Sequence, residues 1–309
     1  MPTNSSRMAV WGLPFLAIRS LRQLGMEPSL RNIVIITRLT VRETMRNRLY
    51  LISVVIAFFF FLISLMPLFF GKHDVPIPTT GRWQSVAVLM VVFMGVPMLK
   101  FFSAIEVIGL SCGAVSSEIE RGILVCILAK PMPRWHVLAG KWLGINCVMA
   151  LNLLFWTTLL WVSLLVQTHQ SFPTLFLAGA VSMLYPVMFS TLTLMFSTFC
   201  TTALAASFAL VCGAAAWPHL LIRIMGMQFH VRALVLAGTI LRYLTPLNHV
   251  EVMVERSLGT LSPRAVDPNF FNPPVKIGPP AGGIWYVAAW TIAAAIVALI
   301  VFQHRDIHA

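Results

Sequence analysis

Two ionisable side chains lie deep inside an apolar stretch of the chain. Residues 85–112 contain Lys100 and Glu106. Charged side chains inside a membrane helix are costly and are functional candidates by default, so each is a candidate for a transport path or a gate. Six helical residues turn through about 240° beyond one full circle, so the two do not face each other. The alternative is that Lys100 snorkels and Glu106 lies near the cytoplasmic interface. Pro97 should kink or hinge the same helix.

Other residue types that bind metals or perform catalysis form no clear pattern. Met90, Met94 and Met98 make a stripe at helical spacing, which could pass Cu(I) along but is more often adaptable packing. The eight histidines and five cysteines are scattered. We find no HExxH sequence, no paired intramembrane aspartates and no P-loop. The sequence therefore predicts no catalytic residue, no metal site and no ATP hydrolysis by this chain.

The composition indicates which elements must position these residues. Hydrophobic residues make up 58% of the 309 residues and charged residues only 10%, with a mean hydropathy of +0.85. Soluble domains carry about 25% charged residues, so we predict an all-α polytopic membrane protein. A membrane-spanning helix needs about 20 apolar residues. Six segments meet this requirement within a transmembrane domain of residues 50–302, namely 50–70, 85–112, 142–166, 174–199, 202–221 and 284–302.

The arginines predict how these spans are oriented. Eight arginines precede the first span, and the loop between the second and third spans adds four basic residues. The positive-inside rule then places both termini, including the tail 303–309, and this loop in the cytoplasm. The net charge of +12 fits contact with anionic lipid better than contact with nucleic acid. The connection 223–283 falls outside, where it should hold short helices and, over 229–244, a surface-lying or re-entrant helix.

Residues 29–48 predict an amphipathic helix within a cytoplasmic N-terminal region, residues 1–49. Arginines recur on one face at spacings of seven and four, and aliphatic residues lie on another. Such a helix lies flat at the lipid headgroups. The alternative is a simple topology signal before the first span. The charged residues of interest are Arg38, Arg42, Glu43 and Arg46.

The cytoplasmic loop predicts a short helix with charges at both ends. Glu118 and Glu120 precede an apolar run, 123–129, that Pro131 and Pro133 stop. Acids at the start and Lys130 at the end suit the helix dipole, and seven apolar residues cannot cross a bilayer. Such an element suits docking into the groove of another protein, although an ordinary loop is the alternative.

This loop resembles the signature of ABC-2 type ABC transporter permeases. In that family an Arg-Glu segment precedes span one. Span two is followed by a Glu-x-Glu-x-Gly-Thr pattern, then by an apolar helix, Pro, Arg and finally Gly-Lys. Ile123 replaces the usual threonine. The subgroup it resembles most contains the copper-site maturation permeases. The matching residues are Arg42, Glu43, Glu118, Glu120, Gly122, Pro131, Arg134, Gly140 and Lys141.

The resemblance implies a transport subunit that is not itself an enzyme. It would lie in the membrane, in a bacterium the inner membrane, and form a dimer with a second permease copy or homologue. A separate ABC ATPase subunit would hold ATP and Mg²⁺ below each half and drive export. Residues 116–133 would be the coupling helix in a groove of that ATPase. The contact residues would be Glu118, Glu120, Arg121, Gly122, Ile123, Leu124, Ile127, Pro131 and Arg134.

Two other functions stay open at this point. One is a family member that serves in an assembly or mechanotransmission complex without moving cargo. The other is a secondary transporter, which would favour internal repeats and interrupted spans that the two halves do not display. The sequence does not identify the cargo.

Overall fold

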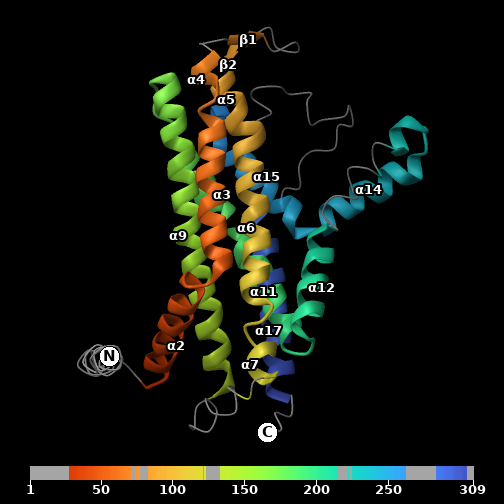
Figure 1. Ribbon diagram of the computed structural model, residues 1–309. Helices are drawn as coiled ribbons and strands as arrows, with labels where there is room; N and C mark the ends of the chain where they lie inside the picture. Colours follow the sequence, from red (N-terminus) through yellow and green to blue (C-terminus); the bar gives the residue numbers. More distant parts are fainter. Residues whose placement is uncertain are drawn as a thin grey trace, which may run out of the picture.

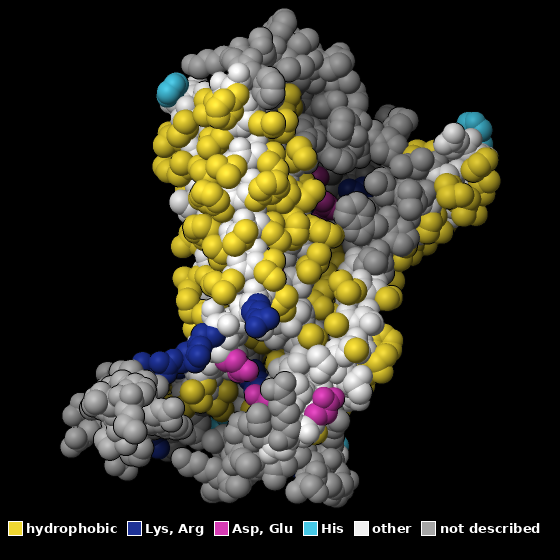
Figure 2. Space-filling model, viewed as in Figure 1, with side chains coloured by type: hydrophobic (Ala, Val, Ile, Leu, Met, Phe, Trp, Pro, Cys, Tyr) yellow, Lys and Arg dark blue, Asp and Glu magenta, His cyan; other side chains and the backbone are white. Residues whose placement is uncertain are grey.

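The protein is a bundle of long helices that stand side by side (Figure 1). The computed structural model describes residues 28–70, 74–76, 83–120, 122, 133–214, 222, 225–261 and 283–304. Apolar side chains cover the length of the bundle in Figure 2, and most of the visible charged side chains lie toward one end, with a few in a recess nearer the other. Such a surface suits a lipid environment, because lipid tails bury apolar groups without cost. The prediction of a helical polytopic membrane protein is confirmed.

Among the described residues, four or five segments qualify as membrane-spanning helices, compared with the six that hydropathy predicts. Four described segments are long and apolar enough to cross a bilayer: Val96–Glu120, Arg134–Thr168, Thr174–Ser197 and Gly283–His304. A fifth exists if two helices bent by 60° at a short break count as one. These two are α2 (Pro28–Met45) and α3 (Arg48–Ser64).

The predicted span 202–221 is represented by a shorter helix. Helix α12 (Thr202–Ala214) has 13 residues and a length of about 20 Å, which is less than the roughly 30 Å of a hydrocarbon core. Residues 215–221 lie outside the described part of the chain. The six-span count therefore stays a prediction.

The helix that carries the two intramembrane charges is not uniform. It begins as α5 (Val86–Met90), continues as the π-helix η1 (Val91–Gly95) and becomes α6 (Val96–Ser111). The amide of Val96 bonds to the carbonyl of Val91, five residues back. Pro97 lacks an amide hydrogen and directly follows this wide turn inside the continuous helix, so a carbonyl one turn before it loses its usual donor. Gly95 lets this wide turn pack against Leu160.

The longest helix extends beyond its predicted bounds. Helix α9 (Arg134–Thr168) has 35 residues and is about 52 Å long, far more than a bilayer requires. It crosses the bundle beside α3 and α6, where Phe60, Phe102 and Trp156 pack with ring centroids 5.7–6.1 Å apart. The remaining bundle helices are α10 (Thr174–Ser182), α11 (Leu184–Ser197) and α17 (Gly283–His304).

One end of the bundle carries a small sheet that hydropathy does not predict. After α4 (Pro67–Phe70), strand β1 (Asp74–Pro76) pairs antiparallel with β2 (Trp83–Ser85), and Val75 faces Gln84 in the register. Figure 1 shows this hairpin at the end opposite α2 and the last turn of α17. We call it the hairpin end.

The predicted external connection contains two amphipathic helices with different surroundings. Helix α15 (Pro246–Leu258) packs against α10 and α17, whereas α14 (Arg232–Leu244) extends away from the bundle (Figure 1). The joint between them is held by side chains that bind the last carbonyls of α14, which a helix end leaves without partners. These bonds are Asn248 Nδ2 to Arg242 O (3.3 Å), His249 Nε2 to Tyr243 O (2.8 Å) and Tyr286 Oη to Leu244 O (2.6 Å).

Candidate functional site

The predicted coupling loop begins with a short helix at the end of the bundle opposite the hairpin. Helix α7 (Ser116–Glu120) follows α6 after a turn at 112–115 and lies near the end of α17 in Figure 1. Gly122 has a positive φ of 69°, and its amide bonds to the carbonyl of Ile119, 3.0 Å away. A left-handed glycine interrupts a helix, so α7 stops before Gly122, and the rest of the expected helix 116–133 lies mostly outside the described residues. Several predicted contact residues lie outside the described residues, namely Arg121, Ile123, Leu124, Ile127 and Pro131.

A lysine from α9 holds α7 in place. The Nζ atom of Lys141 lies 2.5 Å from Oε2 of Glu118, and both side chains are largely buried. The same Nζ donates a hydrogen bond to the carbonyl oxygen of Ala114 in the turn before α7. Glu118 is thus engaged within the chain, whereas Glu120 is exposed. Of the two predicted acidic contacts, Glu120 is the one free to meet another molecule.

Hydroxyl groups from two further helices bind the same turn. Oγ of Ser197, in α11, accepts hydrogen bonds from the amides of Val115 (3.3 Å) and Ser116 (3.1 Å) and donates to the carbonyl of Cys112 (2.8 Å). Ser116 Oγ lies 2.9 Å from Thr202 Oγ1 at the start of α12. A displacement of α7 would therefore shift α6, α9, α11 and α12 together.

Arg134 joins the first turn of α9 to the last turn of α17. Its Nη1 donates to the carbonyl oxygens of Phe302 (3.0 Å) and Gln303 (3.1 Å). A cation is favourable there, because a helix C-terminus carries partial negative charge and unpaired carbonyls. Arg134 thus has an internal role that its place in the loop motif does not reveal.

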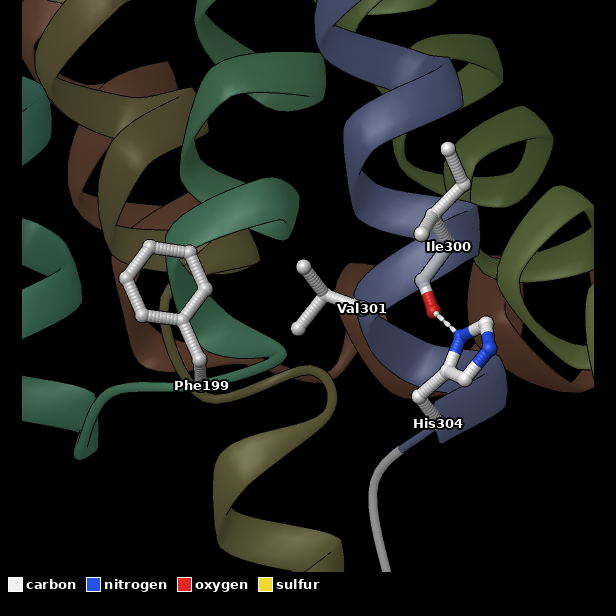
Figure 3. Close-up of a pocket in the computed structure, with 4 residues that line it drawn as sticks. All are labelled: Phe199, Ile300, Val301 and His304. Carbon is white, nitrogen blue, oxygen red and sulfur yellow. Dashed lines mark hydrogen bonds between the residues drawn. The ribbon is translucent and has the colours of Figure 1, made fainter.

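A shallow pocket lies beside this last turn of α17. Figure 3 shows Phe199, from the end of α11, facing Ile300, Val301 and His304 on α17. His304 Nδ1 bonds to the carbonyl of Ile300 at 2.8 Å. The lining is mostly apolar. Among the described residues, no three His, Cys, Asp or Glu side chains come together as a metal site, here or elsewhere.

The amphipathic helix α2 lies along the first turns of α9. Two glycines make this close packing possible: a Cβ on Gly140 would lie 2.7 Å from Cβ of Ile36, and one on Gly144 would lie 2.6 Å from Cβ of Thr40. Gly140 and Gly144 form a G-x-x-x-G pattern, which brings helix backbones close together. Thr40 and Thr44 are accordingly buried.

The other faces of α2 remain open. The predicted polar residues Arg38, Arg42, Glu43 and Arg46 are all exposed. Leu30, Val34 and Met45 are exposed as well, on a flank beside the arginines. The helix therefore has one face for α9, one basic face and one apolar flank. Figure 2 shows the basic side chains gathered at this end of the molecule.

The two intramembrane charges bind different neighbours, as their angular separation predicts. Lys100 Nζ lies 3.1 Å from Glu251 Oε1 of α15 and 5.7 Å from the ring centre of Tyr185 on α11. Glu106 is buried between α3 and α9, where its Oε2 accepts hydrogen bonds from Ser53 and Asn152. Neither charge is near the α7 turn, so the charged groups form three separate sites.

Sequence reasoning missed several residues that position these sites. The sequence marks Ser197 and Thr202 only as hydroxyl residues in apolar helices, and nothing in it indicates that Glu251 pairs with Lys100. Gly144 had a clear signal, because Gly140-Lys-Trp-Leu-Gly144 is a G-x-x-x-G sequence at the start of a span.

Comparison with known proteins identifies the family. No curated protein matches the chain. The family model described as "ABC-2 family transporter protein" matches residues 34–307, which is nearly the whole chain. The match includes most of α2, the α7 turn and every helix after it. The chain therefore belongs to the ABC-2 transporter family and is a membrane permease subunit of an ABC transporter.

Proposed function

We propose that this chain is the membrane half of an ATP-driven exporter, and that a separate ATPase docks at the α7 end of the bundle. The observation that carries the proposal is the attachment of α7: Lys141 and Ser197 fix this short helix to α9 and α11, while Glu120 is exposed. A docked partner that moves α7 would move several spans at once. The resemblance to the copper-site maturation subgroup stays a prediction.

The coupling contact would combine Glu120 with the apolar residues that follow Gly122. Glu118 would act as a positioning residue, because Lys141 already binds its carboxylate. The apolar anchors would be Ile123, Leu124 and Ile127, which the sequence places after α7. Docking of a short segment depends on a few such anchors. ATP and Mg²⁺ would be held by the partner ATPase.

The charges of α2 support a cytoplasmic α7 end. The exposed arginines and the apolar flank of this helix suit the headgroup region of an anionic leaflet. The short helix α7 and the last turn of α17 lie at the same end of the bundle. Both termini and the docking surface would then face the cytoplasm, and the hairpin end would face outward.

A second copy of the permease would complete the membrane domain at α12 and α14. Helix α12 packs on α11 and α6 but exposes Leu204, Phe208 and Val211, and α14 exposes Leu236 and Ile240. In Figure 1, α12 lies at the edge of the bundle beside α11, and α14 extends away from the bundle. Two permease copies that meet along α12 would bury these side chains. The cargo could then cross the membrane between the two copies.

The test is co-purification of the full chain with its ATPase, together with the ATPase rate of the complex in lipid. Leu124→Asp should abolish assembly, because burying an unpaired charge costs roughly several kcal/mol. Glu120→Lys should weaken assembly less, since an exposed charge pair contributes about 0.2–1 kcal/mol. Arg256→Glu, an exposed charge reversal on α15, is the control and should assemble normally.

Two results would decide against the proposal. One is parental assembly and ATPase rate for Leu124→Asp in a protein that inserts normally. The other is robust ATP hydrolysis by the purified chain alone. Uptake or release of candidate cargoes by vesicles with the whole complex would separate an exporter from a family member without transport.

A further inference from the structure

A closed polar cluster lies where three helices of the bundle meet. It consists of Ser53 on α3, Glu106 on α6 and Asn152 on α9, with exposed fractions of 5%, 5% and 3%. Glu106 lies five residues before the end of α6 at Ser111, or about 8 Å along the helix. The aromatic residues Phe60, Phe102 and Trp156 pack between the same three helices. The cluster is therefore enclosed by protein.

The hydrogen bonds of this cluster leave two acceptors unused. Ser53 Oγ donates to Glu106 Oε2 at 2.7 Å, and Asn152 Nδ2 donates to Ser53 Oγ at 2.7 Å and to the same Oε2. Glu106 Oε1 and Asn152 Oδ1 are buried and have no hydrogen-bond partner among the described residues. A buried oxygen with no donor costs free energy, and an ionised one costs more. The cluster lacks one donor.

No described cation compensates a charge on Glu106. On α6 itself Lys100 binds Glu251. On α9, Lys141 binds Glu118, Arg134 binds carbonyls at the end of α17, His136 lies near the start of the helix, and Cys147 is exposed. The titratable groups on the other helices that pack against α6 are at the start of α3, on α11 and on α12. Helix α3 carries Arg48, which is exposed, and Tyr50. Helix α11 carries Tyr185, whose Oη donates a hydrogen bond to the carbonyl of Leu247, and α12 carries Cys212.

The missing donor matches a proton better than a metal ion. Two free oxygens are far fewer than the six to eight that Ca²⁺ takes or the six of Mg²⁺. A proton binds only one of these oxygens, and on Glu106 it neutralises the charge of the carboxylate. The amide of Asn152 has nearly the same shape when turned over, so its oxygen can accept from a protonated carboxyl where its nitrogen donates to an ionised one. Ser53 can serve both states, because a hydroxyl donates and accepts.

We propose that Glu106, with Ser53 and Asn152, is a proton-binding site within the membrane domain. In the packed bundle Glu106 is a neutral carboxylic acid. When α3 or α9 separates from α6, water reaches the carboxyl group and the proton leaves to that water. Because the packed state binds one proton more than the opened state, acid favours packing and alkali favours opening. This property belongs to the permease chain alone and does not depend on the docked ATPase.

Infrared spectroscopy of the full chain in lipid nanodiscs tests the protonation directly. At neutral pH the wild type should show the carbonyl stretch of a buried carboxylic acid, and Glu106→Gln should lack it. Glu251→Gln, which removes a half-exposed carboxylate paired with Lys100, should keep the band. Ser53→Ala retains Glu106 but loses a hydrogen bond to it, so the band should remain and change frequency. This variant serves if Glu106→Gln does not fold.

Thermal unfolding tests the link to packing. The melting temperature of the wild type should fall from mildly acidic to mildly alkaline pH by several degrees more than that of Glu106→Gln. A wild type without the carboxylic-acid band at neutral pH overturns the proposal. So does a pH dependence that Glu106→Gln leaves unchanged. A melting temperature that follows sodium or potassium concentration but not pH would identify a cation site instead.

Discussion

Lys141 on α9 and Glu118 on α7 form an ion pair with 2.5 Å between Nζ and Oε2, and the two side chains are only 7% and 17% exposed. Replacing one partner leaves the other charge buried without compensation, which costs about 3–5 kcal/mol. The pair therefore makes the position of α7 sensitive to a residue that is distant in the sequence.

We expect Lys141→Met to lower the melting temperature of the detergent-solubilised chain by more than about 5 °C. The double variant Lys141→Met/Glu118→Leu should recover most of this loss, because no uncompensated charge remains. Glu120→Gln, a change of an exposed acid in the same helix, should have little effect. Equal loss in the single and double variants would mean that the ion pair does not hold α7.

The contact between α2 and α9 should fail when either glycine gains a branched side chain. Gly144→Val would place methyl groups where Thr40 now lies, so α2 should separate from α9. Trypsin should then cleave after Arg38 and Arg42 much faster than in the parent. Leu143→Val alters the exposed neighbour and should leave the cleavage rate unchanged. Resistant Gly144→Val protein would show that the helices are joined by other contacts.

The ion pair of Lys100 and Glu251 should respond unequally to the loss of each partner. The Lys100 side chain is 13% exposed and that of Glu251 is 50% exposed. Glu251→Gln leaves a mostly buried ammonium group, which costs about 1–3 kcal/mol. Lys100→Met leaves a carboxylate that is half exposed, so it can keep more of its contact with polar surroundings and should cost less.

Melting temperatures of the two variants measure this difference, with Arg256→Gln as a control on the same helix. A larger loss for Lys100→Met than for Glu251→Gln would contradict the burial argument.

The joint between α14 and α15 should loosen when a bond to the end of α14 is removed. Tyr286→Phe deletes the hydroxyl that donates to the carbonyl of Leu244, a loss of about 0.5–1.5 kcal/mol. Hydrogen exchange of the α14 amides should become several-fold faster. Thr291→Val removes a hydroxyl that binds only within α17, and should leave α14 unchanged. Unaltered exchange in Tyr286→Phe would count against the role of this bond.

Hydropathy predicted most of the bundle because lipid-facing helices must be apolar along their length. It placed the start of α9 at Trp142, eight residues late, since His136 and Lys141 are polar. Both are buried by neighbouring protein at the end of the bundle, which a single-helix hydropathy reading does not detect. The β1–β2 hairpin was missed because three-residue strands have no measurable alternation.

That the α7 end is the coupling site stays a prediction, and the sequence did not reveal the internal bonds of this segment. The acid pair, the glycine and the lysine of the loop motif are all present at the α7 end. Lys141 and Glu118 are 23 positions apart, and Lys100 and Glu251 are 151 apart. Pairings over such distances are set by how helices pack, and charge spacing along one helix carries no information on them. For this reason the sequence did not reveal that the carboxylate of Glu118 binds Lys141.

The π-helix at Val91–Gly95 gives span two a way to change register without unfolding. A π-turn contains about one residue more than an α-turn, and such bulges occur often at functional sites. If the wide turn migrates along the span, each residue it passes rotates by about 100° and shifts by about 1.5 Å, while the backbone stays hydrogen-bonded. The part of the span nearest the hairpin end would then rotate relative to α6 in discrete steps. The packing of Leu160 against Gly95 would favour one of these rotational positions.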